Sequence, residues 1–114
     1  MFERDGYDVT IHVPITFSQA VLGDDVEVPT VDGRIVQHIP EGTQSGTKFR
    51  LRGQGIQYLN GRGRGDQYVI VDVEIPKKVT RAQREALKAF EDSMKEDNYE
   101  KRKGFFKNLR DRFS

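Results

Sequence analysis

Turn signals built on glycine divide residues 1–76 into short segments, and this division limits the fold more than any other feature of the chain. Pairs such as Asp5-Gly6, Asp32-Gly33 and Ser45-Gly46 are typical of tight turns. Between the turns, apolar and polar residues alternate over residues 9–15, 26–28, 35–39, 49–51 and 69–75. The pattern predicts a mainly β fold, a small antiparallel β-sandwich or partly open barrel, with a hairpin at Asp32-Gly33.

Two stretches break the alternation and predict helices. Thr16 is a suitable N-cap for a short internal helix over residues 17–22, and Gly23 is expected to end it in a left-handed conformation. After Pro76, a longer helix is expected over residues 80–95, because Thr80 and Gln83 have capping-box spacing. Apolar residues recur there at helical spacing, at Ala82, Ala86, Leu87, Phe90 and Met94.

The last segment, residues 99–114, is basic and aromatic. It holds 6 Lys and Arg against Glu100 and Asp111, a net charge of +4 within a chain of formal net charge +1. Phe105, Leu109 and Phe113 recur at every fourth position, so a second short amphipathic helix is expected. The predicted fold class is a mainly β body followed by one or two C-terminal α-helices.

The composition excludes several classes of protein. The 114 residues include no Cys, so disulfides, thiol catalysis and Cys-based zinc sites are ruled out. No apolar run reaches the ~18 residues of a membrane span, and no secretory signal is visible at the N-terminus. A net charge of +1 argues against a dedicated nucleic-acid binder. We expect a cytoplasmic protein with no membrane or nucleic-acid partner.

The residues that an enzyme or a metal site needs are nearly absent. His12 and His38 are the only histidines, and both take polar positions of predicted strands. The sequence places neither of them beside a serine nucleophile. Asp24, Asp25 and Asp32 lack the spacing of a calcium loop, and turn formation explains them. The chain is therefore expected to be neither an enzyme nor a metal-binding protein.

The segment Gly61-Arg62-Gly63-Arg64-Gly65 has two interpretations. Its arginines and backbone N–H groups suit phosphate, which together with the basic tail would give an RNA- or ribosome-associated binding module. The other interpretation is a flexible connection between strands with solvated arginines, and we favour it because no aromatic pair flanks the segment for base stacking. Binding to nucleic acid would fall steeply with ionic strength, whereas apolar binding would change little.

The apolar residues after Pro76 also leave alternatives open. They can pack on another copy of the chain or another partner, on the chain's own strands, or on a membrane surface. Self-association is favoured, because a chain of this size has a small core and the tail concentrates aromatic residues. The residues expected to carry dimerisation are Leu87, Phe90, Met94, Phe105, Phe106, Leu109 and Phe113.

Several motifs resemble one known family. Residues 39–46 read IPEGTQSG and residues 49–55 read FRLRGQG, and shorter matches occur at residues 2–9, 13–17, 19–23, 28–33, 65–66 and 73–76. In this order they resemble the second C-terminal domain of the DnaJ family, the J-domain co-chaperones that deliver unfolded proteins to the ATP-driven chaperone DnaK. The resemblance covers about residues 2–95, and the tail is similar to the C-terminus of bacterial members.

The resemblance implies a non-catalytic homodimer that holds unfolded clients for transfer to a DnaK-type chaperone and dimerises through its last helix. The expected parts are a β-sandwich domain over residues 2–78, a dimerisation helix over residues 79–98, and a basic amphipathic tail over residues 99–114 that contributes to dimerisation. If this domain keeps a client surface, the contacts are expected at Ile11, Val13 and Val28. Packing in the core is the alternative interpretation of the same three residues.

Other parts of the family are missing from the sequence. It has no His-Pro-Asp tripeptide of a J-domain and no Cys-rich repeat. No cofactor is therefore expected in this chain, and zinc is expected only in the missing Cys-rich region. The chain is expected to be an excised fragment, with Met1 as an added start residue. Gln37 departs from the pattern, because Ile35 and Ile39 favour an apolar residue between them.

Overall fold

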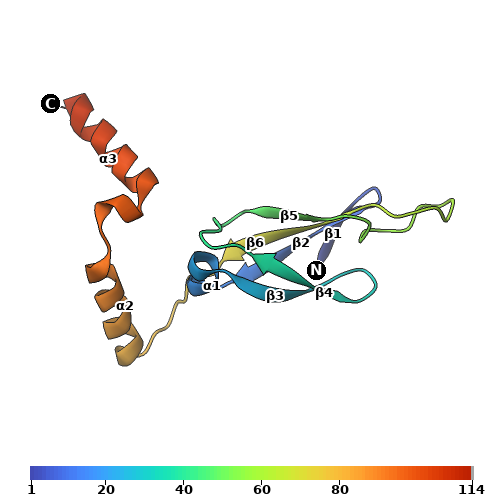
Figure 1. The fold of residues 1–114 in the computed structure, drawn as a ribbon, viewed down its shortest axis with the longest axis horizontal. Coiled ribbons are helices and arrows are strands. Elements are labelled where there is room, and N and C mark those ends of the chain that lie inside the picture. The colour runs from blue at the N-terminus through green and yellow to red at the C-terminus, as the bar shows by residue number, and fades with distance from the viewer. Residues whose placement is uncertain (114) are drawn as a thin grey trace. The chain divides into compact units, whose positions relative to one another are not determined.

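The computed structural model describes residues 1–113 of the chain. Two compact units make up the chain, Met1–Ile75 and Pro76–Ser114. We call them the strand unit and the helical unit, and each is described by itself (Figure 1). The basic tail was predicted to extend to Ser114, which lies outside the described residues.

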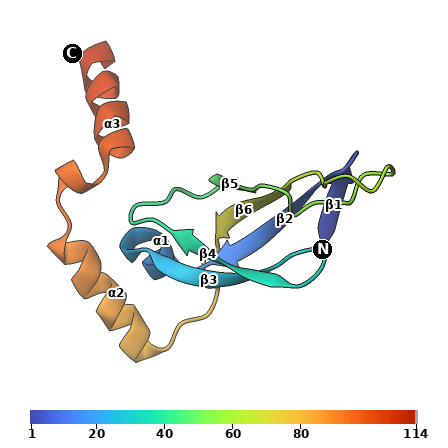
Figure 2. The ribbon, with the colours of Figure 1, turned by 45° about the vertical axis from the view of Figure 1, so that its right-hand side comes forward.

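The strand unit has two layers of β-sheet. Its strands are β1 (Phe2–Asp5), β2 (Asp8–Ile15), β3 (Asp24–Pro29), β4 (Arg34–Ile39), β5 (Lys48–Leu51) and β6 (Gln67–Val73). A four-stranded sheet has the order β1-β2-β6-β5, and the pair β3-β4 lies across one face of it (Figure 2). The mainly β prediction is confirmed, and the strands of the described residues form no closed barrel. Strand β1 was not predicted.

The central pair of the large sheet corrects the antiparallel prediction. Three pairs are antiparallel, but β2 and β6 run parallel, with Ile11 opposite Val69 and Val13 opposite Val71. Parallel neighbours need a long connection, and here α1 (Phe17–Leu22) and strands β3 to β5 supply it. Alternation in a sequence identifies the buried face of a strand but not the direction of the strand beside it.

The predicted internal helix is confirmed as α1. The backbone N–H of Gln19 donates to Thr16 Oγ1 (3.0 Å), and that of Thr16 donates to Gln19 Oε1 (2.9 Å), which is a capping box. Gly23 ends the helix with a φ of 78°, but its ψ of 155° is extended and not the left-handed helical value that we expected. A Cβ on Gly23 would lie 2.8 Å from Ile39 O, so the approach to β4 requires glycine.

The core lies between the two sheets and contains one polar side chain that the sequence analysis missed. The buried apolar cluster consists of Ile11, Ile15, Ala20, Val28, Ile39, Val69 and Val71. Gln67 is fully buried beside it, and its Nε2 donates to Pro29 O (2.8 Å), which joins β6 to β3. Its Oε1 has no hydrogen-bond partner among the described residues. Gln67 shares the inward phase of Val69 and Val71, which is the signal that predicts its burial.

The helical unit consists of α2 (Arg81–Ser93), a single 3₁₀ turn η1 (Glu96–Asn98) and α3 (Glu100–Phe113). Thr80 and Gln83 form the predicted capping box. The helix α2 ends at Ser93, two residues before the predicted end, so that Met94 is its C-cap. The second predicted helix is confirmed as α3. None of the described helices has the length and apolar character to cross a bilayer.

Candidate functional site

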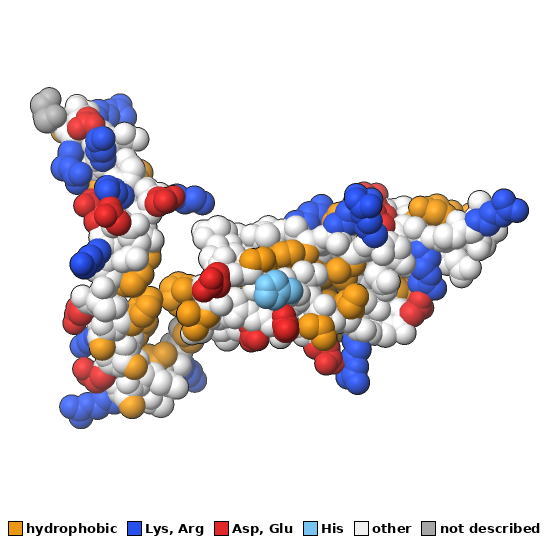
Figure 3. All heavy atoms as spheres, in the orientation of Figure 1, with side chains coloured by type: hydrophobic (Ala, Val, Ile, Leu, Met, Phe, Trp, Pro, Cys, Tyr) orange, Lys and Arg blue, Asp and Glu red, His pale blue; other side chains and the backbone are white. Residues whose placement is uncertain are grey.

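The residues predicted to carry dimerisation all lie in the helical unit and remain accessible. Leu87 on α2 is 60% exposed, and Phe105 and Phe113 on α3 are 62% and 78% exposed. Phe90, Phe106 and Leu109 are exposed to a smaller extent, and Met94 is half-buried. No described residue of α2, η1 or α3 is buried. Figure 3 shows that apolar side chains on α2 reach the surface between charged ones.

A helical unit without buried residues has little to stabilise it. Isolated helices shorter than about 12–15 residues are marginal in water, because most helical stability in proteins comes from packing an apolar face. The helices α2 and α3 have 13 and 14 residues. Covering their apolar side chains with a partner surface would supply the missing packing free energy, at roughly 25 cal/mol per Å² of apolar area.

Contacts within the helical unit fix α3 to η1. Lys103 Nζ on α3 donates to Asp97 Oδ1 on η1 (2.5 Å). This hydrogen bond holds the pKa of the Asp97 carboxyl below its ordinary value and raises the pKa of Lys103. On α3 itself, the Phe105 and Phe106 rings meet edge to face at 5.0 Å, and the Arg102 guanidinium lies 4.6 Å from the Phe106 ring centroid.

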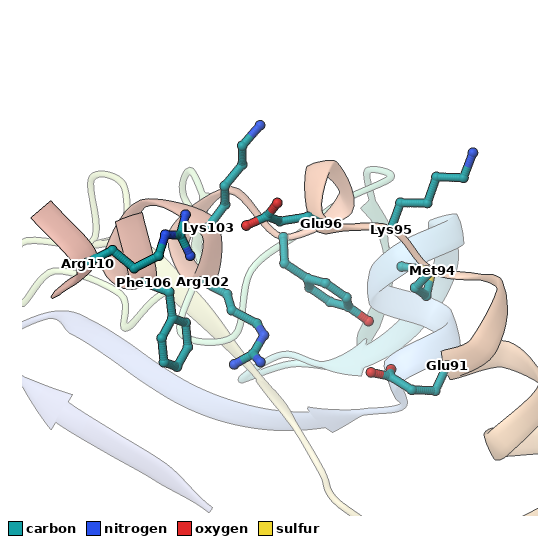
Figure 4. A pocket seen from close by; sticks show the side chains of 9 residues that line it. Glu91, Met94, Lys95, Glu96, Arg102, Lys103, Phe106 and Arg110 are labelled. Carbon is teal, nitrogen blue, oxygen red and sulfur yellow. The ribbon is translucent and has the colours of Figure 1, made fainter. Parts of the chain in front are cut away.

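A cavity of about 620 Å³ lies between the end of α2, η1 and α3. Met94, Tyr99 and Phe106 give it apolar walls, and its charged lining consists of Glu91, Lys95, Glu96, Arg102, Lys103 and Arg110. Lys95 and Lys103 point away from the cavity (Figure 4). The arrangement suits an apolar side chain of a partner, held beneath a rim of charges of both signs.

The three residues predicted to contact clients lie in the core of the strand unit or pack against it. Ile11 and Val28 are buried in the core, which is the alternative that the sequence analysis left open. Val13 on β2 is partly buried and packs against the same cluster. Alternation along a strand identifies an inward face, but it does not tell whether that face lines a core or an open groove.

The Gly-Arg segment lies in an ordered turn. Gly55 N donates to Gly65 O (2.9 Å), and Ile56 N donates to Tyr7 O (2.9 Å). Arg64 is paired with Asp32 and also donates to Gly55 O (3.2 Å). One of the two arginines considered for phosphate binding is thus engaged within the strand unit, which corrects the expectation that both arginines are merely solvated.

Asp66, which follows this segment, accepts hydrogen bonds from three groups. Its Oδ1 accepts from Gly53 N (2.9 Å), and its Oδ2 accepts from Arg50 Nε (2.8 Å) and Nη2 (2.6 Å). The Gly53 N–H and then the Arg50 guanidinium hold the pKa of Asp66 below its ordinary value. Residues 49–55 and 65–66 are two of the motifs that carry the family resemblance, and this carboxylate joins them in space.

Replacing Asp66 by Asn is expected to lower the free energy of unfolding at pH 7. Because the pKa of Asp66 is depressed in the folded state, its contribution is present above the ordinary value of 3.8 and is lost as the pH falls through the folded pKa. Urea unfolding at pH 7 and pH 3 should therefore show a difference between Asp66→Asn and the parent that shrinks in acid. Asp5→Asn is the control, and a difference that stays constant with pH would contradict the assignment.

Both histidines form pairs with aspartates on the surface. His12 Nδ1 lies 2.8 Å from Asp72 Oδ2, and His38 Nδ1 lies 2.8 Å from Asp25 Oδ1. In residues 1–113, neither histidine forms a hydrogen bond with a serine. Within the same residues, no group of three or more His, Asp or Glu side chains is placed to hold a metal ion.

Comparisons with known proteins give consistent matches along the chain. Residues 1–76 match the DnaJ C terminal domain, and residues 82–114 match the Chaperone protein DnaJ C-terminal region. Curated relatives named Chaperone protein DnaJ occur in Ruminiclostridium cellulolyticum (51% identical over 99% of the chain), Clostridioides difficile (50% over 99%) and Listeria monocytogenes (48% over 98%). The chain spans 29% to 30% of the length of these relatives.

Proposed function

Because the chain belongs to the DnaJ C-terminal domain family, we propose that it is the part of a DnaJ-type co-chaperone that forms the homodimer and holds unfolded clients for transfer to a DnaK-type chaperone. The helical unit makes the dimer, and the strand unit supplies the holding surface. The role is binding, with no catalytic step.

The observation that carries the dimer is the exposure of the apolar side chains on α2 and α3, with no described residue of either helix buried. A two-fold arrangement is the commonest solution for such a surface, because each copy covers the same patch of the other. The contact residues proposed are Leu87, Phe90, Met94, Phe105, Phe106, Leu109 and Phe113.

Dimerisation would make weak holding effective. One strand unit has a small surface, so a single extended segment would bind it weakly and leave quickly. Two strand units linked in a dimer bind the same client at a high effective concentration, which strengthens the attachment without any new kind of contact. Such holding is reversible, and transfer to a second chaperone requires reversibility.

Deleting residues 104–114 is expected to raise the dimer dissociation constant by about tenfold or more, because burying one Phe side chain is worth roughly 1.5–3 kcal/mol. Sedimentation equilibrium of the parent and the truncated chain measures the change. When each is added to a chemically unfolded protein, the truncated chain should suppress the aggregation of that protein less than the parent does. An unaltered dissociation constant would show that α3 takes no part in the dimer.

A further inference from the structure

A second exposed apolar surface lies in the strand unit, where α1 ends. Leu22 is 69% exposed there, and Val21 beside it is also exposed. Leu22 lines a hollow of about 480 Å³ together with Gly23, Asp24, Asp25, His38, Pro40 and Glu41. We call this hollow the α1 groove. Its lining shares no residue with the cavity of the helical unit, and it does not include the core residues Ile11 and Val28.

The walls of the α1 groove are fixed by hydrogen bonds. Gly42 N donates to Val21 O (3.1 Å) and Thr43 N donates to Ala20 O (3.0 Å), so the segment after β4 is tied to the last turn of α1. From α1, Gln19 Nε2 donates to Asp24 Oδ2 (3.2 Å), which ties the helix to the start of β3. A surface held in this way loses little conformational entropy when a ligand binds to it.

The charge of the α1 groove is acidic. Three carboxylates line it, and no Lys or Arg does. His38 compensates Asp25 only in part, since the imidazole is paired through Nδ1 (2.8 Å) and is charged only when protonated. The strand unit as a whole carries 7 Lys and Arg against 11 Asp and Glu, a net charge of −4.

We propose that the α1 groove holds client segments in which an apolar residue is flanked by Lys or Arg. The apolar side chain would pack on Leu22 and Pro40, and the flanking cations would lie beside Asp24 and Glu41. A segment with acidic flanks would meet repulsion from the same carboxylates. This assignment rests on the proposed function, and it names the class of client that the strand unit selects.

The charge and the volume of the α1 groove favour an unfolded segment as its occupant. A cation-flanked apolar residue complements a hollow that is lined by Leu22, Pro40 and three carboxylates. A hollow of this volume takes one or two side chains of an extended chain and not the face of a folded protein. Contacts this small fit the weak, reversible holding that the dimer then multiplies.

Two fluorescent peptides that differ only in their flanks test the selection. Both contain a central Leu-Val-Leu triplet, and it is flanked by Lys in one and by Glu in the other. In fluorescence anisotropy with the full chain, the Lys-flanked peptide is expected to bind about tenfold more tightly at low salt, with a difference that shrinks as salt screens the charges. Leu22→Ser and Glu41→Lys should each weaken its binding about fivefold or more.

Matched control variants separate the groove from general effects of charge and hydrophobicity. Glu3→Lys makes the same change of net charge on β1, and Leu59→Ser removes an apolar side chain that is 93% exposed. Both should leave the affinity for the Lys-flanked peptide unchanged. Circular dichroism should show that all four variants are folded.

The outcomes distinguish this inference from the proposed function. If both peptides bind equally and the groove variants bind as the parent does, the α1 groove is not the holding site, but holding itself stands. If neither peptide binds and aggregation of an unfolded protein is not suppressed, the proposed holding function fails as well. If Leu22→Ser and Glu41→Lys lower the dimer fraction instead, the groove is an interface between copies, and the client assignment is wrong.

Discussion

Leu87→Glu is expected to convert the dimer into a monomer. Leu87 is a largely exposed side chain on α2, and in a dimer that covers this face its carboxylate replacement would be buried without a partner. A penalty of about 3 kcal/mol corresponds to a rise in the dissociation constant of about a hundredfold. Sedimentation velocity at a concentration at which the parent is dimeric should then show a single slower species.

Lys88→Glu is the matched control for this experiment. It lies one position further along α2, outside the predicted apolar stripe, and it alters the net charge by two units where Leu87→Glu alters it by one. If charge alone opposed association, Lys88→Glu would dissociate the dimer more than Leu87→Glu does. A parent-like dimer of the folded Leu87→Glu chain would instead exclude this face of α2 from the interface.

The same comparison on α3 tests whether both helices contribute. Phe105→Glu places a charge among the aromatic residues of the tail. Lys107→Glu, the control, reverses a charge beside them. If Phe105→Glu dissociates the dimer and Leu87→Glu does not, α3 alone makes the contact.

The sequence predicted both apolar surfaces, but it left open what covers them, because a helical stripe has the same spacing whether it meets its own chain or another copy.

Local interactions were predictable from the sequence. The capping boxes at Thr16 and Thr80 formed as their spacing indicated, because a cap depends on residues only three positions apart. The alternating runs formed strands for a similar reason, since successive side chains of a strand point to opposite faces and the pattern is visible within a few residues. These patterns contain their own geometry, and no information from distant residues is needed to interpret them.

Interactions between distant segments were not predictable. The parallel pairing of β2 with β6 depends on the path of the intervening chain. The burial of Gln67 depends on a carbonyl of β3 that reaches its side chain, at Pro29. For the candidate sites, the exposure of Leu22 depends on how the end of α1 packs, and its acidic surroundings come from β3 and from the turn after β4.

Gly65→Ala is expected to destabilise the strand unit by about 3 kcal/mol or more, which is large for a single methyl group. A Cβ on Gly65 would lie 2.1 Å from Tyr7 O and 2.8 Å from Asp8 Oδ1, far inside van der Waals contact. Tyr7 O also accepts the hydrogen bond from Ile56 N, and Asp8 Oδ1 accepts one from Asp66 N (2.7 Å). Relieving the clash would therefore break the bonds that join the turn between β1 and β2 to Ile56, in the connection after β5, and to Asp66, just before β6.

Gly33→Ala is the control for Gly65→Ala, because a Cβ at Gly33 would meet no atom within 4 Å and its φ is not in the left-handed region. Urea unfolding of both variants at one protein concentration, which keeps any effect of dimerisation constant, should show a large loss for Gly65→Ala and a small change for Gly33→Ala. Equal stabilities would mean that the turn is not packed against Tyr7. The Gly-Arg segment would then be the flexible connection that its sequence suggests. Turn formation alone would explain its glycines, and close packing would not require them. A large loss for Gly65→Ala alone would instead assign this glycine to close packing, so that phosphate binding is not needed to explain it.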